Sequence, residues 1–146
     1  MKNRKSIFLI PLIGYLGLWV LGSIAFLVYF RMFNISVDSN YVDMIRKIPA
    51  PLAILTVPGC SFISFFITSK TVFAKLEPPV GKQLVLRTAL VSVLVTIGLD
   101  IIITVLIQQM DILLFPVNLM YLLAWAVIVP TVLLAGYRTS RERKVP

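Results

Sequence analysis

The chain has 146 residues, of which 59% are hydrophobic and 14% charged, and its mean hydropathy is +0.96. This composition is too apolar for a soluble domain and too rich in long apolar runs for a disordered chain, so we expect a polytopic membrane protein. The net charge of +8 does not indicate nucleic acid as a partner, because the positive residues are confined to the segments between apolar runs.

The first apolar segment runs from Ser6 to Phe30 without a charge and exceeds the roughly 20 residues needed to span a bilayer. We expect an uncleaved span rather than a signal peptide, because apolar sequence continues beyond the small residues Ser23 and Ala25. Three glycines in this segment predict close packing against another helix: Gly14, Gly17 and Gly22.

The same segment carries an aromatic stripe. Tyr15, Trp19, Phe26 and Phe30 are spaced by four, seven and four residues, which places them on one side of a helix. Two interpretations remain open: the stripe packs against other helices, or it lines a groove for a lipid or quinone.

The first external loop, residues 31–49, contains a short amphipathic pattern. We expect a short interfacial helix lying on the outer membrane surface. Its apolar side would carry Tyr41, Ile45 and Ile48, and its charged side Asp43, Arg46 and Lys47.

The second span is predicted from Pro51 to Ser69, which is barely long enough to cross. Pro58 removes one backbone hydrogen bond, so a kinked helix is expected. Small, weakly polar residues recur at every fourth position and predict a face for close packing with the first or third span: Thr56, Cys60, Ser64 and Thr68.

The third span is predicted from Thr88 to Gln108 and contains the carboxylate Asp100 deep inside an apolar run. Thr96, Asp100 and Thr104 lie one helical turn apart and form one polar patch. A carboxylate near the bilayer centre costs at least ~2.5–3.5 kcal/mol, so it should face other helices or a wet cavity. Asp100 is therefore the principal candidate for an ion, proton or hydrogen-bonding site.

The fourth span is predicted from Ile112 to Tyr137, after a minimal turn that makes it an antiparallel neighbour of the third. Trp125 lies too deep for an interfacial belt, so its indole N–H needs an internal acceptor, which Asp100 could supply. Counting residues from the turn instead makes Tyr121 the nearest polar candidate and leaves Trp125 one turn deeper.

Eleven of the fourteen Lys and Arg residues lie in the N-terminal segment, the 70–87 loop and the tail, and three lie in the first external loop. This asymmetry predicts an all-α membrane protein with a single domain over residues 1–146, an antiparallel bundle of four transmembrane helices and both termini in the cytoplasm. We expect cytoplasmic basic residues to contact anionic lipid head groups: Lys70, Lys75, Lys82, Arg87, Arg138 and Arg141.

Few kinds of chemistry are open to this chain. It has one cysteine and no histidine, which excludes an intramolecular disulfide, a cysteine zinc site, a bis-histidine haem site and a Ser-His-Asp triad. The motifs GxGxxG, GxxxxGK[ST], GxSxG and HExxH are also missing. We therefore do not expect the protein to be an enzyme, and we expect no catalytic residues, no metal and no cofactor.

Three functional hypotheses follow. The first is a non-enzymatic accessory subunit or lipid-binding module that packs against a partner membrane protein or a lipid through its glycine-rich first helix and aromatic face. For its protein partner we expect either a second copy of the chain or another membrane protein. The second is a small homo-oligomeric transporter or channel in which Asp100 couples to a proton or cation. The third, an enzyme acting on a lipid head group, lacks an evident nucleophile or base. Compact loops favour a prokaryotic cell (inner) membrane.

Overall fold

The computed structural model describes residues 7–36, 41–76, 80–103 and 117–142. Within these ranges the chain is almost entirely helical and contains no β-strand. Four of its helices are long and apolar enough to cross a membrane, which supports an integral membrane protein and confirms the expected number of long helices. The helices are α2 (Leu9–Met32), α3 (Tyr41–Arg46), α4 (Ala50–Lys75), α5 (Lys82–Asp100) and α6 (Val117–Glu142).

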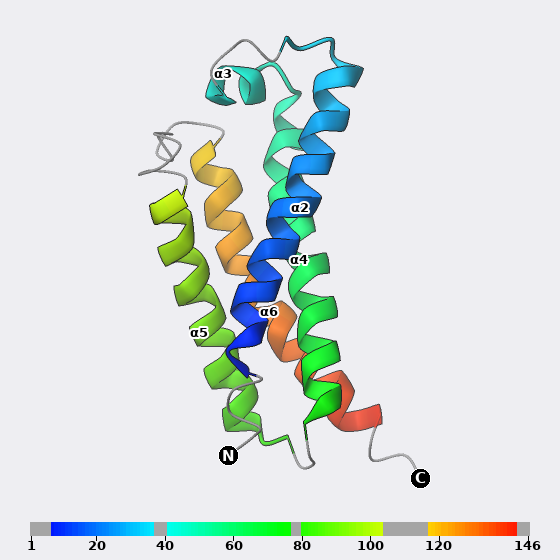
Figure 1. Cartoon of the computed structure of the whole chain (residues 1–146), viewed down its shortest axis with the longest axis vertical. Helices are drawn as coiled ribbons and strands as arrows, with labels where there is room; N and C mark the ends of the chain where they lie inside the picture. Colours follow the sequence, from blue (N-terminus) through cyan, green and yellow to red (C-terminus); the bar gives the residue numbers. More distant parts are fainter. Residues whose placement is uncertain (1–6, 37–40, 77–79, 104–116, 143–146) are drawn as a thin grey trace.

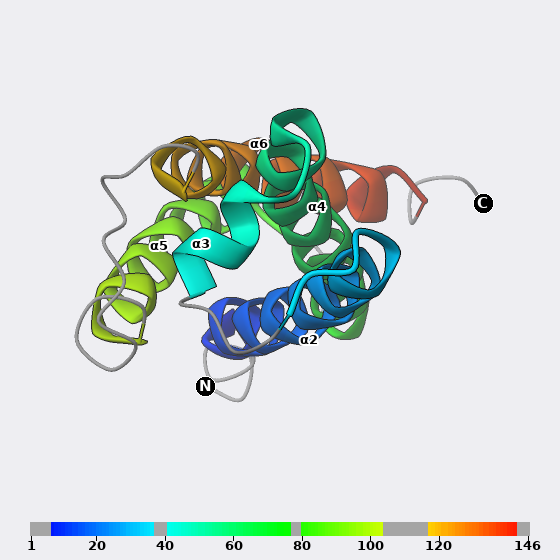
Figure 2. The same cartoon turned by 90° about the horizontal axis from the view of Figure 1, so that it is seen from above.

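The four long helices run side by side in an elongated bundle (Figure 1). Helices α2 and α5 run in one direction, and α4 and α6 run in the other. Helix α4 packs extensively against both α6 and α2, while α5 packs mainly against α6. Figure 2 shows α3 lying across one end of the bundle. The start of α2, the end of α6 and the adjoining ends of α4 and α5 lie at the opposite end.

Several helices extend beyond the apolar segments that predicted them. Helix α4 continues past Ser69 to Lys75, α5 begins at Lys82, before Thr88, and α6 continues past Tyr137 to Glu142. Lysine tolerates such positions, because its apolar stem lies along the helix while its ammonium group reaches the membrane surface. The predicted end of the third span and the predicted start of the fourth both fall within residues 104–116, which lie outside the described residues.

Local signals account for where α2 ends and where α4 begins. The Ile35 N–H donates to the Phe30 carbonyl at 2.8 Å, and Asn34 has a φ of 50°, the left-handed conformation that closes many helices. Helix α4 begins directly after Pro49 and has Pro51 in its first turn, where a missing backbone N–H costs no intrahelical hydrogen bond.

Helix α3 closes the end of the bundle with its apolar residues. Val42 and Ile45, and Ile48 just after the helix, are buried, whereas Asp43 and Arg46 are exposed and form an ion pair at 4.0 Å. The amphipathic pattern predicted for this loop therefore corresponds to a helix that packs on the bundle; its placement at a membrane surface stays a prediction. The side chain of Tyr41 lies outside the described part of the chain.

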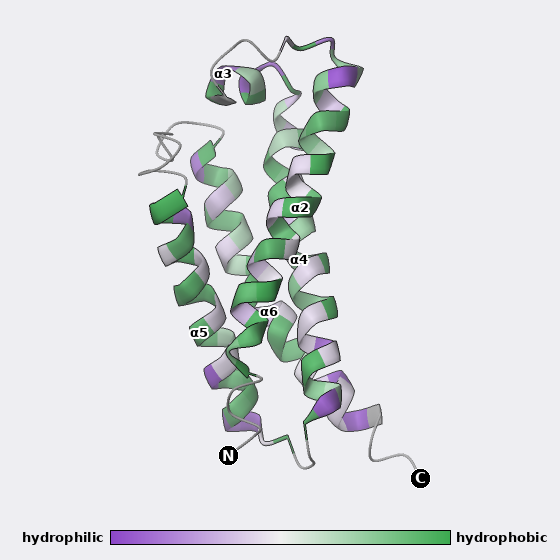
Figure 3. Ribbon diagram, in the orientation of Figure 1, coloured by the Kyte–Doolittle hydropathy of each residue, from purple (hydrophilic) through white to green (hydrophobic). Residues whose placement is uncertain are grey.

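The buried apolar residues form two clusters, one near each end of the bundle. The first joins Phe26 and Phe30 of α2 to α3 and to Met120 of α6. The second surrounds Phe65 and Phe73 of α4 near the opposite end. Figure 3 shows hydrophobic residues along the lengths of the helices and the most hydrophilic ones towards the ends.

Glycines set the closest helix contacts. A Cβ atom at Gly14 would lie 2.7 Å from Cε1 of Phe65, and one at Gly17 would overlap the Ser64 hydroxyl. That hydroxyl donates to the Gly14 carbonyl at 2.7 Å and joins α4 to α2. On the other side of the bundle, a Cβ atom at Gly136 of α6 would lie 2.5 Å from Cγ1 of Val85. Any larger side chain at these positions would push the helices apart.

Candidate functional site

Asp100 is the last residue of α5, and residues 101–103 continue the chain as a π-helical turn. Its carboxyl group is held from both sides: the Tyr15 hydroxyl donates to Oδ1 at 2.9 Å, and the Trp125 indole N–H donates to Oδ2 at 2.6 Å. Asp100 is only 2% exposed. These two hydrogen bonds join α2, α5 and α6 at one point.

The residues around Asp100 lie between the two apolar clusters. On α2, Tyr15 falls between Ile10 of one cluster and Phe26 of the other. Removing a carboxylate from water is costly unless hydrogen bonds replace its solvation, and here each oxygen has one donor. Asp100 forms no ion pair with any Lys or Arg in the described ranges.

Buried hydroxyls precede Asp100 on the same face of α5. Thr88, Ser92 and Thr96 are all buried. Thr88 donates to the Leu84 carbonyl at 2.8 Å, whereas the hydroxyls of Ser92 and Thr96 have no hydrogen-bond partner among the described residues. Thr96, predicted as part of the Asp100 patch, is thus a neighbour of the carboxylate along the helix rather than its hydrogen-bond donor. Thr104 lies outside the described residues.

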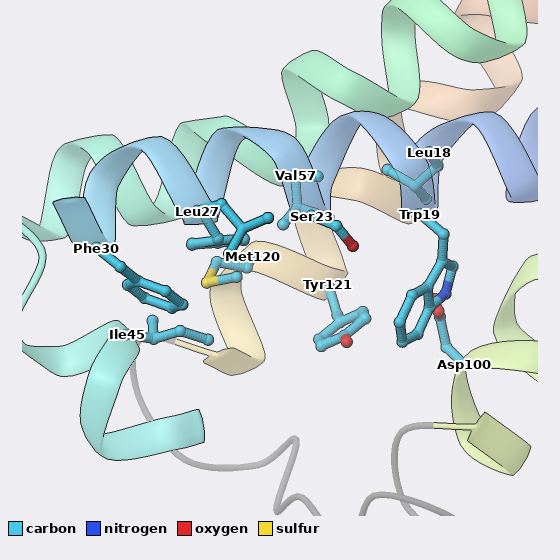
Figure 4. A pocket seen from close by; sticks show the side chains of 12 residues that line it. Leu18, Trp19, Ser23, Leu27, Phe30, Ile45, Val57, Asp100, Met120 and Tyr121 are labelled. Carbon is cyan, nitrogen blue, oxygen red and sulfur yellow. The ribbon is translucent and has the colours of Figure 1, made fainter. Parts of the chain in front are cut away.

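A pocket of about 280 Å³ extends from Asp100 towards α3 (Figure 4). It lies between α2 and α6, which make little contact with each other, and all five described helices contribute to its wall. Val57 of α4 and Ile45 of α3 line it together with residues of α2 and α6. Ser23 and Leu27, on the α2 side, are themselves exposed, so the pocket reaches the outer surface of the bundle.

The two ends of the pocket differ in chemistry. Figure 4 shows Asp100 beside Trp19 at one end, with Tyr121 near them, and Phe30 beside Ile45 at the other. The wall between the two ends is predominantly apolar. A site of this kind suits a molecule with one polar end and an apolar body.

The aromatic stripe on α2 serves both this pocket and the carboxylate. Trp19, Phe26 and Phe30 line the pocket, while Tyr15 donates to Asp100. Gly22, between Trp19 and Phe26, also lines it, and a Cβ atom at Gly22 would meet nothing within 4 Å. Gly14 and Gly17 contact α4, whereas Gly22 leaves open space in the pocket.

The row of small residues on α4 makes several different contacts. The Thr56 hydroxyl donates to the Leu52 carbonyl at 2.6 Å and lies 3.1 Å from the Tyr29 hydroxyl of α2. Ser64 donates to α2 as described above, and Thr68 is buried. Cys60 is a free, half-buried cysteine. Two residues of the row, Thr56 and Ser64, therefore contact α2, one of the two partners expected for it.

The predicted head-group residues gather at the end of the bundle opposite α3. Five of the six side chains are exposed and Lys70 is half-buried. The Arg138 guanidinium lies 5.8 Å from the centre of the Phe66 ring, where a cation and an aromatic face attract each other. This end is thus basic on the outer surface of α4, α5 and α6.

Sequence reasoning named Trp125 and Tyr121 as alternative neighbours of Asp100. The structure places Trp125 in direct hydrogen-bonding contact and Tyr121 in the adjoining pocket. The sequence reasoning missed Tyr15 as the second donor. The position of this tyrosine in an apolar span was nevertheless a signal that its hydroxyl needed a partner. In the described ranges no group of three His, Cys, Asp or Glu side chains is arranged to hold a metal ion.

No protein-family model matches the chain, and no curated protein or solved structure shows a significant match to it.

Proposed function

We propose that this membrane protein is a non-enzymatic lipid-binding module. It holds a single-chain apolar or amphipathic molecule in the pocket between α2 and α6. The observation that carries the proposal is the pocket itself. It has an apolar wall, a polar end at Asp100 and Trp19, and a side that reaches the outer surface beside Leu27. A lipid in the bilayer could therefore enter laterally.

The size of the pocket favours one chain over a whole phospholipid. Its volume of about 280 Å³ lies at the lower limit of typical small-molecule pockets, which hold roughly 300–1,000 Å³. Trp19 and Phe30 are eleven positions apart, a helical rise of about 16 Å. A narrow site of this length accommodates one extended chain with a compact polar end.

The charge distribution supports an orientation and additional partners. With eleven Lys and Arg residues on one side and three on the other, the α3 end would face outward and the opposite end the cytoplasm. Exposed lysines and arginines at the cytoplasmic end would then contact anionic lipids, each contributing about 1 kcal/mol near the surface. We place the protein in a prokaryotic cell (inner) membrane, associated with a second copy or another membrane protein.

The proposal is tested by filling the pocket. Gly22→Phe places a ring in the open space at Gly22, whereas Gly59→Phe adds the same ring at an exposed glycine of α4 that also has nothing within 4 Å. The contacts of Tyr29 with Thr56 and Gly14 with Ser64 place Gly22 level with about residue 60 of α4, so the two variants are matched in depth.

All three proteins are purified from the same membranes into nanodiscs, and their bound lipids are measured per protein by mass spectrometry. We expect one single-chain species to be retained by the wild type and by Gly59→Phe and depleted in Gly22→Phe. The same lipid content in all three proteins would contradict a pocket ligand.

A second candidate function is proton- or cation-coupled transport by a homo-oligomer. The observation that favours it is the pair of buried hydroxyls, Ser92 and Thr96, without partners in the described part of the chain. These hydroxyls lie on α5 on one side of Asp100, and the pocket opens on its other side. A carboxylate in such a position is typical of ion and proton pathways.

Transport is tested in proteoliposomes containing a trapped pH-sensitive dye. Under this second candidate, Asp100→Asn and Thr96→Val would abolish dye acidification after an imposed proton gradient. Thr131→Val is the control, because Thr131 is also a buried threonine but donates to the Val127 carbonyl of its own helix. No proton flux by the wild type above empty liposomes would remove a proton pathway through Asp100.

A further inference from the structure

We propose that the ligand of this pocket is cationic: a single-chain amphiphile with an ammonium group, which Asp100 and the neighbouring aromatic rings select over a neutral molecule of the same shape. The inference rests on the proposed lipid-binding function and adds the chemical class of the ligand. It follows from the charge, the aromatic surroundings and the shape of the pocket.

The first step concerns charge. Asp100 lies within the apolar part of the bundle and forms no ion pair in the described ranges. On their own helices, Arg87 lies about 20 Å from Asp100 and Arg31 about 24 Å from Tyr15 by helical rise. Tyr15 and Trp125 donate hydrogen bonds to the carboxyl group but bring no positive charge. An ammonium group in the pocket would supply it.

The second step concerns the rings at this end. Each donor to Asp100 has an aromatic neighbour one turn along its own helix: Trp19 follows Tyr15 with ring centres 6.5 Å apart, and Tyr121 precedes Trp125 at 6.2 Å. Trp19 and Tyr121 both line the pocket (Figure 4). The electron-rich faces of such rings attract an ammonium group, most strongly where water is excluded.

The third step concerns selectivity. The chain carries a net charge of +8, so its overall field repels cations and gives them no unspecific advantage. A preference for a cation would therefore arise at Asp100. The remainder of the ligand would lie along Phe26 and Met120 towards Phe30 and Ile45, where only an apolar chain suits the wall.

The experiment compares decyltrimethylammonium with its neutral carbon analogue, in which a carbon atom replaces the nitrogen. Both are titrated into nanodiscs of zwitterionic lipid that contain the full chain, and concentrations are expressed per lipid. Intrinsic fluorescence reports on this site directly, because the chain has two tryptophans, Trp19 in the pocket wall and Trp125 on Asp100.

We expect the wild type to bind the cation at least about tenfold more tightly than the neutral analogue, since a desolvated cation–aromatic contact alone provides that factor. In Asp100→Asn the ratio of the two affinities should fall towards one. The wild-type comparison needs no variant, so the inference stays testable even if Asp100→Asn fails to fold.

Two outcomes separate the inference from the function on which it rests. Equal affinities for the two ligands, both lost in Gly22→Phe and kept in Gly59→Phe, would overturn the selection for charge and leave the lipid-binding function standing. Binding of both ligands that is unaffected by Gly22→Phe would overturn both.

Discussion

The Tyr15 hydroxyl donates a hydrogen bond of 2.9 Å to Oδ1 of Asp100, across 85 positions of sequence. It joins the middle of α2 to the end of α5, and the Trp125 bond adds α6. One polar contact thus connects three of the four long helices at the level between the two apolar clusters. The pocket begins at the same place, because Asp100, which accepts both hydrogen bonds, also lines its polar end.

Tyr15→Phe should destabilise the protein by about 1–2 kcal/mol, because Oδ1 of a buried carboxyl group loses its donor where water cannot replace it. The measurement is reversible unfolding of the detergent-solubilised protein by SDS. Tyr137→Phe is the control, since Tyr137 is 45% exposed and its substitution should change the free energy of unfolding little.

The interaction between Tyr15 and Asp100 can be measured with a double-mutant cycle. Asp100→Asn retains one acceptor oxygen and turns N–H groups towards one of the two donors. Tyr15→Phe should therefore cost less in the Asp100→Asn background than in the wild type, with an interaction energy of at least about 0.5 kcal/mol. Additive effects of the two substitutions would mean that the hydroxyl and the carboxyl group do not interact.

The glycines of α2 should respond differently to alanine. Gly14→Ala should destabilise the protein by about 1–2 kcal/mol, because the new methyl group meets the fully buried ring of Phe65. Gly22→Ala should be neutral or stabilising by up to about 1 kcal/mol, because alanine favours the helix and the position is open. Thermal unfolding of both variants in one detergent checks the difference, and equal effects would contradict the pocket at Gly22.

A smaller residue on α5 should compensate for a larger one at the contact with α6. Gly136→Ala alone should cost about 1–3 kcal/mol, since its Cβ atom would lie 2.5 Å from Cγ1 of Val85. Val85→Ala removes that obstacle, so the double variant should be more stable than the sum of the single effects predicts. A purely additive result in SDS unfolding would show that these two residues are not in contact.

The proposed orientation can be tested with single cysteines. Cys60, the one cysteine of the chain, is first replaced by serine, and cysteine is then introduced at Lys47, Lys82 or Arg141, all exposed. A membrane-impermeant maleimide should label Lys47→Cys in intact cells and the other two only after permeabilisation. The reverse pattern would invert the topology.

Local features of the sequence determined the class of the protein and its most unusual residue. Four apolar runs long enough to cross a bilayer predicted the four long helices, and apolar residues at helical spacing opposite charged ones predicted α3. Asp100 was identifiable because a carboxylate in such a run has no local compensation. These properties depend only on residues within a single continuous segment of the chain, so the sequence displays them directly.

The partners of Asp100 depended on the tertiary structure. Counting residues along the chain left Tyr121 and Trp125 as alternatives, since a small rotation or shift of one helix exchanges residues one turn apart. Tyr15 was named for an aromatic stripe, and only the placement of α2 beside α5 brings it to the carboxyl group. Gly22 resembles Gly14 and Gly17 in sequence, yet it faces open space in the pocket between α2 and α6, two helices that contact each other little. Helix rotation and separation arise from packing between distant segments, which periodicity within one segment does not encode.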